Sequence, residues 1–343
     1  MDARRVVAGF AVAVLLLAVL VVGFGGERVL WGLRQADATT FALAPAGTLL
    51  AVACWGLALY RLTRPVPGAP SGMAFVGAYA TGVLLRNLAP WGRSGGSLLM
   101  AAALDRAGGT RYEELLGATA TSEFLGSVGS VTVAGTGLAA LLASGEASEG
   151  VVAAAVVFGG FVAVLALAAV VVVALPEVVV RVAALLLAGL RGVLGRVWPA
   201  ADRYLVSVAP VERVERLLET VRRIARDPGT LLPAAGFTVA AAMVSVGPLW
   251  LSLRAVDAAV AIPTLMVVLP LSGFAGVVPL PGGTGGVEFA LVGLLVAATS
   301  LEVATLAAGV LLYRLSTYWF TLAVGGVGAV GLAGGVRLED YPD

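Results

Sequence analysis

Apolar segments long enough to cross a membrane recur along the whole sequence. A hydrocarbon core about 30 Å thick requires roughly 20 apolar residues in helical form. Segments of that length lie at 6–25, 41–60, 115–142, 151–175, 231–253 and 303–334. The chain is 59% hydrophobic and 13% charged, whereas soluble domains carry about 25% charged residues. The sequence therefore predicts an all-α polytopic integral membrane protein.

The first apolar segment superficially resembles a secretory signal peptide. It follows Arg4 and Arg5 and runs from Val6 to Phe24. The segment is long enough to span a bilayer, however, and residues 25–27 lack the small-residue pattern of a cleavage site. We predict that it is retained as the first transmembrane helix.

Arginine placement sets the expected orientation, because basic residues favour the cytoplasmic side. Residues 176–230 contain nine Arg against six acidic residues, whereas 144–150 contains two Glu and no Arg. We predict that residues 176–230 are cytoplasmic and that residues 144–150 are external. The alternation of Arg, Glu and apolar residues in 211–226 predicts an amphipathic helix on the membrane surface, or equally a solvated cytoplasmic hairpin. Both termini are expected in the cytoplasm, and the protein in the plasma membrane.

Two further apolar stretches are interrupted by Gly/Pro-rich breaks. The paired pieces are 72–90 with 97–106 and 258–279 with 287–300. Since Arg64 and Arg111 are both expected in the cytoplasm, the chain between them crosses the membrane twice or not at all. We predict two re-entrant hairpins that enter from opposite faces, beside about six full spans, with about eight full spans as the alternative.

The two breaks resemble each other. The first, residues 90–96, reads PWGRSGG, and the second, residues 281–286, reads PGGTGG. Glu123 and Arg314 follow these breaks at nearly equal distances. Interrupted helices at corresponding positions of two halves are typical of an inverted-topology repeat. The predicted halves are 41–142 and 231–334. Both lie within a single predicted transmembrane domain, residues 1–343.

The second break has the composition of an anion site. Proline ends the preceding helix, and the glycines permit positive φ and close backbone approach. A half-helix starting near Val287 would point unpaired N–H groups toward the break, which suits a phosphate. Glu288 in its first turn requires an oppositely charged partner at this depth, either for function or to hold the fold. We expect this partner to come from the other half of the chain, with Arg93 as the first candidate and Arg314 as the second. The candidate binding residues here are Pro281, Gly282, Gly283, Gly285, Gly286 and Glu288.

Other polar residues inside apolar runs predict a wet path. Arg86, Asn87 and Arg93 flank the first break, and Tyr313 and Arg314 interrupt the last apolar run. An intramembrane Arg is a functional candidate by default. Its structural alternative is a counter-ion for an acidic residue, with Glu288, Glu302 and Glu123 as candidates. We predict substrate-binding roles for Arg86, Asn87, Arg93, Tyr313 and Arg314, and charge balance or gating for Glu123 and Glu288.

Composition argues against several kinds of chemistry. The chain has no His, which is the usual general base and the commonest metal ligand. Its single cysteine, Cys54, excludes a disulfide or cysteine metal site within one chain. A Walker A motif requires Lys, which is absent. The elbow-like 92–96 and the dinucleotide-like 326–331 both lack the preceding strand that those motifs need. We therefore expect the protein to have no catalytic residues, no bound metal and no cofactor, and not to be an enzyme.

The second break and the last polar insertion carry a family resemblance. PGGTGGVE at 281–288, an apolar helix, and then Tyr-Arg-Leu at 313–315 before a Tyr-Trp pair resemble the lysylphosphatidylglycerol synthase transmembrane (flippase-like) family. Residues 87–92 with Glu123 are similar to its upstream block, although Ser-Glu-Phe replaces that family's Glu-Arg pair. The resemblance extends over 6–334. It implies movement of aminoacylated phospholipids between leaflets, and other relatives are associated with glycolipid and polyprenyl-phosphate pathways.

The resulting functional expectation is a flippase-like protein. It would translocate an anionic or zwitterionic lipid or lipid-linked headgroup between leaflets. The alternative is a non-transporting scaffold subunit of an envelope-lipid pathway, docked through 176–230, and a weaker one is an enzyme using Glu288 as acid or base. Since the sequence ends at Asp343, we expect no soluble aminoacyl-transfer domain. The expected partners are membrane lipids and an envelope-lipid biosynthetic enzyme, without nucleic acid; oligomerisation stays open.

Overall fold

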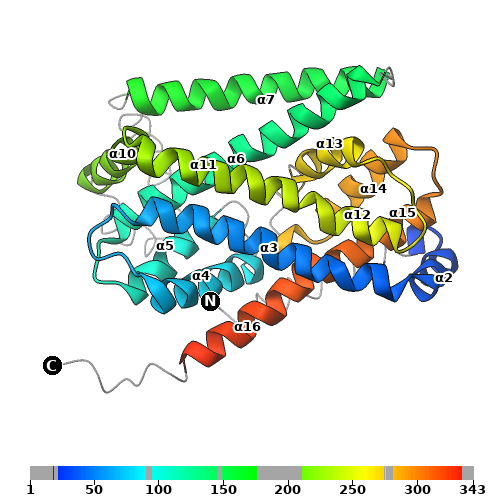
Figure 1. The fold of residues 1–343 in the computed structure, drawn as a ribbon, viewed down its shortest axis with the longest axis horizontal. Coiled ribbons are helices and arrows are strands. Elements are labelled where there is room, and N and C mark those ends of the chain that lie inside the picture. The colour runs from blue at the N-terminus through cyan, green and yellow to red at the C-terminus, as the bar shows by residue number, and fades with distance from the viewer. Residues whose placement is uncertain are drawn as a thin grey trace, which may run out of the picture.

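Every element that the structure describes is a helix, as predicted. The computed structural model describes residues 18, 22–89, 95–144, 149–175, 211–273, 275 and 281–333. No strand occurs within these ranges. The long helices run roughly along the long axis of an elongated bundle (Figure 1). The predicted first span at 6–25 lies almost entirely outside the described residues, as do Pro90 to Ser94 and residues 176–210.

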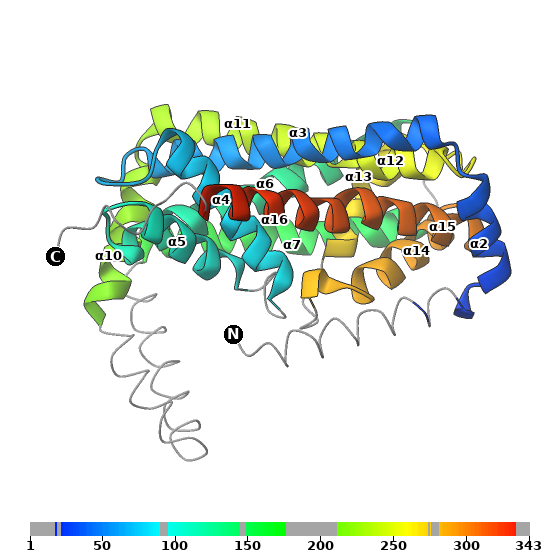
Figure 2. The ribbon, with the colours of Figure 1, turned by 90° about the horizontal axis from the view of Figure 1, so that it is seen from below.

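Two long helices pack side by side along one face of the bundle (Figure 2). They are α3 (Ala38–Thr63) and α11 (Pro228–Val244), which α12 (Val246–Arg254) continues. The junction of α11 and α12 follows from Pro248, which lacks the N–H that would bond the carbonyl of Val244. In Figures 1 and 2, α3 and α11–α12 lie next to each other over most of the length of the molecule.

A short helical hairpin precedes the longest helix of the first half. Helices α4 (Gly72–Leu88) and α5 (Gly96–Ala107) pack against each other. The N–H of Gly109 donates to the carbonyl of Gly68 at 3.0 Å, so the two ends of this hairpin meet. The chain then continues into α6 (Tyr112–Ala143).

The second half repeats this order of elements. Helices α13 (Ile262–Ser272) and α14 (Gly286–Ala298) pack against each other. They precede α15 (Val303–Arg314), which passes through a π-helical turn, Leu315–Trp319, into α16 (Phe320–Ala333). The predicted span at 303–334 is thus one helical run with a π interruption directly after Arg314. In Figure 1, the α4–α5 hairpin lies toward one end of the bundle and α13–α14 toward the other.

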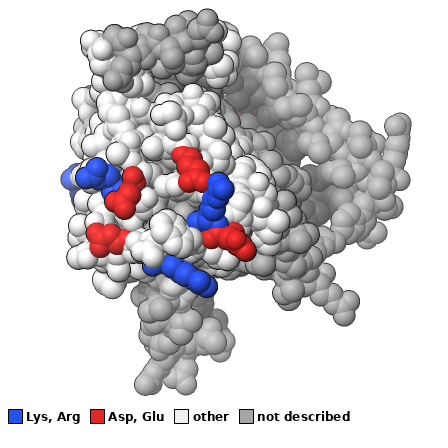
Figure 3. Space-filling view, turned by 90° about the vertical axis from the view of Figure 1, so that its right-hand side faces the viewer, with Lys and Arg blue, Asp and Glu red and all other residues white. Residues whose placement is uncertain are grey.

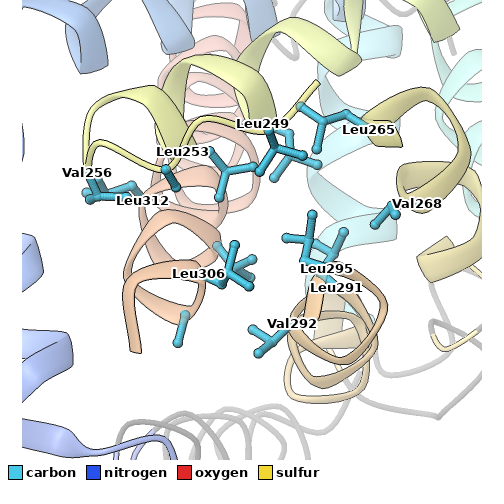
Figure 4. Close-up of a cluster of buried hydrophobic side chains, with 14 of the residues drawn as sticks. Leu249, Leu253, Val256, Leu265, Val268, Leu291, Val292, Leu295, Leu306 and Leu312 are labelled. Carbon is cyan, nitrogen blue, oxygen red and sulfur yellow. The ribbon is translucent and has the colours of Figure 1, made fainter. Parts of the chain in front are cut away.

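Each hairpin packs against the long helix of the other half. Helix α13 lies on α6, and α4 lies on α16. A buried apolar cluster joins α12, α13, α14 and α15 (Figure 4). Its members include Leu249, Leu253, Leu265, Leu291, Leu295 and Leu306. These leucines pack the second hairpin within its own half, whereas the contacts of α13 with α6 and of α4 with α16 join the two halves.

Three helices lie at the periphery: α2 (Gly26–Gln35), α7 (Glu149–Ala174) and α10 (Val211–Ala225). Helix α10 is the described part of the predicted amphipathic segment, and it packs against α6 and α11. Ile224 on its apolar face is fully buried. Arg213 and Arg223 pair with Glu113 and Glu114 at 3.1 and 3.6 Å. The apolar face of α10 therefore contacts protein, and two of its arginines bind the start of α6.

Three of the described helical runs are long and apolar enough to cross a membrane, namely α3, α6 and α11–α12. Large apolar side chains on the outside of these helices, such as Leu49, Leu50 and Leu232, are exposed. The end of the molecule near α2 carries a small number of charges of both signs (Figure 3). The protein is a helical membrane protein with lipid-compatible sides.

The first testable consequence concerns the cap of α3. The Asp37 carboxylate accepts hydrogen bonds from Thr40 and Thr39, which lower its pKa from 3.8 to about 2. A lowered pKa stabilises the folded state above the unfolded value and loses that effect as pH falls through the folded value. Asp37→Asn should therefore lower the melting temperature in detergent at pH 7, and the difference should vanish toward pH 2. The exposed Asp257→Asn, at the same end of the molecule, is the charge-matched control. An equal loss there would contradict a specific role of the Asp37 charge in the cap.

Candidate functional site

A buried ion pair lies where the second break meets α15. The Nε of Arg314 donates to Oε1 of Glu288 at 2.6 Å. The Glu288 side chain is 0% exposed and that of Arg314 is 8% exposed. Burying either charge alone would be very unfavourable, so each side chain compensates the charge of the other. Both charges belong to the second half. The expectation that the partner of Glu288 comes from the first half, with Arg93 as a candidate, is therefore not met; Arg93 lies outside the described residues.

The same two side chains also fasten the backbone of the break. Nη2 of Arg314 donates to the carbonyl of Gly282 at 3.1 Å. The other carboxylate oxygen of Glu288 accepts the N–H of Gly285 at 2.7 Å. This bond satisfies one of the N–H groups that the start of α14 leaves unpaired. The Glu288 carboxylate thus occupies part of the place that the sequence suggested for a phosphate.

The glycines of the break are required by its geometry. Gly282, Gly283 and Gly285 have positive φ values of 60°, 66° and 90°, as predicted. A Cβ on Gly282 would lie 2.0 Å from the ring of Tyr318. Pro281 begins the tight turn that contains Gly282, and Gly286 begins α14. The break is therefore shaped to admit an aromatic ring against its backbone.

Tyr318 links the break to the first half of the chain. Its ring centroid lies 4.8 Å from the Arg314 guanidinium carbon, a cation–π contact. Its hydroxyl donates to the backbone carbonyl of Asn87 in the last turn of α4, at 3.2 Å. Tyr318 lies in the π-helical turn, and such turns are frequent at functional sites. It is the junction between the second break and the helix that leads into the first.

A second ion pair joins the first hairpin to α6. Nη1 of Arg86 lies 3.1 Å from Oε1 of Glu123, and these side chains are 35% and 45% exposed. The amide of Asn87 donates to the carbonyl of Val83 on the same helix. Gly96 at the start of α5 leaves room for Arg86, since a Cβ there would lie 3.3 Å from its Nε. This pair is accessible, in contrast to Glu288–Arg314.

A cavity of about 610 Å³ lies between the two halves. Its wall includes Arg86, Asn87 and Glu123 from the first half, and Gly282, Tyr313 and Arg314 from the second. Serines and threonines of α6, α13 and the π-helical turn supply further polar wall. The size suits a small ligand or a lipid headgroup. Charges that lie far apart in the sequence therefore converge on one polar space.

The structure thus brings most of the predicted site residues together. Glu288 holds both Arg314 and the N–H of Gly285, and Arg314 holds the carbonyl of Gly282. Pro281, Gly283 and Gly286 belong to the backbone of the same break. Within the described residues, no cluster of three His, Cys, Asp or Glu could hold a metal ion.

In the sequence, Tyr318 was noted only as part of the Tyr-Trp pair and was given no role, and Tyr79 and the hydroxyl residues that line the cavity were missed. The hydroxyl of Tyr79 on α4 donates to the carbonyl of Val52 on α3 at 3.0 Å. The Ser and Thr residues that recur along α6 within 119–130 were the available sequence pattern, since Thr119, Ser122, Ser127 and Ser130 all line the cavity. Hydroxyl residues are common in apolar helices for packing alone, so the pattern acquires meaning only in three dimensions.

A substitution at Glu288 tests whether its ion pair holds the site together. Glu288→Gln leaves the Arg314 charge buried without compensation, which costs about 3–5 kcal/mol. The matched control is Glu302→Gln, which breaks the Arg28–Glu302 pair at 2.9 Å with side chains 78% and 54% exposed; exposed pairs contribute about 0–1 kcal/mol. Thermal unfolding in detergent should show a large loss for Glu288→Gln and almost none for Glu302→Gln. Equal effects would contradict a structural role for the buried pair.

The comparisons with known proteins agree with the resemblance seen in the sequence. The family model described as the lysylphosphatidylglycerol synthase TM region matches residues 6–325 of the 343-residue chain. A comparison with curated proteins gave no match. The matched range contains both breaks, both ion pairs and the cavity between them. The chain belongs to the family of the lysylphosphatidylglycerol synthase TM region.

Proposed function

We propose that this protein translocates the headgroup of a membrane lipid between the two leaflets. The observation that carries the proposal is the cavity of about 610 Å³, with Arg86, Glu123 and several Ser and Thr side chains in its wall, between the halves of an otherwise lipid-compatible bundle. A headgroup fits such a space, whereas the acyl chains can stay in the bilayer beside the protein. The polar wall replaces water around the headgroup and so lowers the cost of crossing the hydrocarbon region.

Both hairpins are proposed to be re-entrant. The contact between Gly68 and Gly109 brings the two ends of the α4–α5 hairpin together, as a re-entrant hairpin requires. The shared element order of the two halves, together with hairpins at opposite ends, supports an inverted repeat. The Arg-rich α10 end would then be cytoplasmic. Helix α16 runs toward that end in Figure 1, which favours a cytoplasmic C-terminus.

The two ion pairs would have different tasks in this proposal. The buried Glu288–Arg314 pair keeps the second break folded, since separating it is strongly unfavourable. The half-exposed Arg86–Glu123 pair contributes little stability and opens cheaply. Arg86 and Glu123 are therefore the charges that can exchange partners when a headgroup arrives. Asn87 and Tyr313 line the same space beside them.

Lipid movement in liposomes tests the proposal directly. The purified protein, reconstituted with fluorescent phospholipids, should raise the rate at which inner-leaflet label reaches an external quencher. Ser127→Trp would fill the cavity and should return the rate to that of protein-free liposomes. Thr136→Trp, on the same helix but exposed and away from the cavity, is the matched control and should transport normally. Rates that Ser127→Trp does not change would contradict translocation through this cavity.

A labelling experiment distinguishes the re-entrant hairpin from two full spans. In a Cys54→Ala background, Gly95→Cys places a thiol at the first break. A re-entrant hairpin keeps this thiol from a membrane-impermeant maleimide added outside, whereas two spans expose it. Asp257→Cys should label from outside and Arg64→Cys should not, which controls for orientation. External labelling at Gly95 would support the model with about eight spans.

The rival function is a non-transporting subunit that holds an envelope-lipid biosynthetic enzyme. It predicts no lipid movement in liposomes and co-purification of an enzyme with the intact protein. Arg213 and Arg223 are already bound to α6, which leaves fewer charges of α10 for a partner. This arrangement favours translocation as the first hypothesis to test.

A further inference from the structure

The carbonyl of Asn87 lies at the end of a helix, where backbone groups need partners from outside that helix. Helix α4 ends at Leu88, and the carbonyls in the last turn of a helix have no N–H of the same helix to bind. Inside an apolar bundle, such a carbonyl is unfavourable without a partner. The hydroxyl of Tyr318 donates to the carbonyl of Asn87 at 3.2 Å. A residue of the second half therefore caps a helix of the first half.

The ring of Tyr318 is packed into the second break. Tyr318 is 4% exposed, and a Cβ on Gly282 would overlap its ring. The ring centroid lies 4.8 Å from the guanidinium carbon of Arg314, which also binds the carbonyl of Gly282. The side chain of Thr284 is a second hydrogen-bonding partner of the Tyr318 hydroxyl. The break, the arginine and the tyrosine ring therefore form one packed unit.

The π-helical turn holds Tyr318 in this position. The hydroxyls of Ser316 and Thr317 both donate to the carbonyl of Tyr313, at 3.0 and 2.7 Å. The ring of Trp319 packs edge-on against that of Tyr318, with the centroids 5.2 Å apart. Side chains thus stabilise the turn from within. Because close-packed groups transmit a displacement instead of absorbing it, Tyr318 can pass a movement at one of its ends to the other.

The Asn87 end of this hydrogen bond lies next to a charge that can change its partner. Asn87 follows Arg86, whose guanidinium lies 3.1 Å from the carboxylate of Glu123, with side chains 35% and 45% exposed. Exposed pairs of this kind contribute little stability. The side-chain amide of Asn87 donates to the carbonyl of Val83 at 2.9 Å, so Asn87 is fastened to α4. A displacement of the end of α4 therefore reaches Tyr318 through the Asn87 carbonyl.

We propose that Tyr318 is a positioning residue that couples the Arg86–Glu123 pair to the second break. The proposal rests on the proposed function, because Arg86, Arg314 and Tyr318 all line the cavity assigned to the headgroup. A headgroup that separates the first pair shifts the end of α4, and Tyr318 passes this shift to the backbone of Gly282. The second half of the cavity wall thus responds to a ligand that binds at the first half.

The packing of α16 on α4 is the competing route between the halves. A Cβ on Gly325 would lie 3.3 Å from Cβ of Leu84, so these helices are in close contact without any hydroxyl. Tyr318→Phe separates the two routes, since it keeps the aromatic ring and this helix packing and removes the hydroxyl. Thr284→Val is the matched control, because it removes a hydroxyl contact within the second half and keeps the bond to Asn87.

Hydrogen exchange of the purified full-length protein tests the coupling without transport. Arg86→Gln separates the first pair and should raise amide exchange in 281–288 by about threefold to tenfold, the range that one hydrogen bond supports. The same substitution should have no further effect in a Tyr318→Phe background and its full effect in a Thr284→Val background. A single melting transition in detergent verifies that each variant is folded.

Three results of this exchange experiment would overturn the coupling. They are no effect of Arg86→Gln in the native background, an equal effect with Tyr318→Phe, and a lost effect with Thr284→Val. The control for charge removal alone is Arg28→Gln, which breaks the exposed Arg28–Glu302 pair and should leave exchange in 281–288 unchanged.

The liposome assay tests whether translocation uses this coupling. Tyr318→Phe should slow lipid movement by about threefold to tenfold. Adding Arg86→Gln to it should slow movement by much less than the product of the two single effects, as expected of coupled residues. Single effects that multiply would overturn the role of Tyr318 in translocation. If the native protein moves no lipid, the proposed function fails, whereas the exchange experiment still decides the coupling.

Discussion

The contact between Glu288 and Arg314 is the constraint on which the second half depends. A helix break inside an apolar bundle exposes backbone groups that lipid cannot satisfy. Here one side chain of the pair binds the carbonyl of Gly282 and the other binds the N–H of Gly285, while the two charges neutralise each other. The ion pair therefore supplies hydrogen-bond partners for two backbone groups of the break, and it buries no net charge.

The position of this pair determines what surrounds it. Arg314 ends α15, and the π-helical turn that follows places Tyr318 over the guanidinium and against the backbone of Gly282. Tyr318 then reaches the end of α4 through the carbonyl of Asn87. The two halves are therefore joined between the second break and the end of α4, and the cavity lies beside this contact. The first half has its own pair, Arg86–Glu123, but in a more exposed setting. The Glu288–Arg314 pair is therefore buried, whereas the Arg86–Glu123 pair is accessible.

Several features could be read from residue order alone. Arg314 was identified as a candidate because one charge stood in a long apolar run, and Glu288 because a carboxylate followed a glycine-rich break. Positive φ at Gly282 and Gly285 followed from composition. The partner of Glu288 could not be assigned in this way, because the sequence does not show whether Arg93 or Arg314 lies next to Glu288 in the folded protein. The residues that line the cavity were equally inaccessible, since a serine in an apolar helix has the same sequence pattern whether it faces lipid, a neighbouring helix or a cavity.

By itself, the sequence determined the helical membrane class, the two breaks and the charged residues near them. These properties depend on segment length, apolar content and local backbone preference, all of which are encoded in neighbouring residues. The tertiary structure alone decided which charges pair, how deeply each pair is buried and which hydroxyl oxygens face the common space. Those properties depend on how α6, α13, α15 and α4 pack across the two halves. Pairing and burial are set by contacts between segments far apart in the chain, and no local pattern contains them.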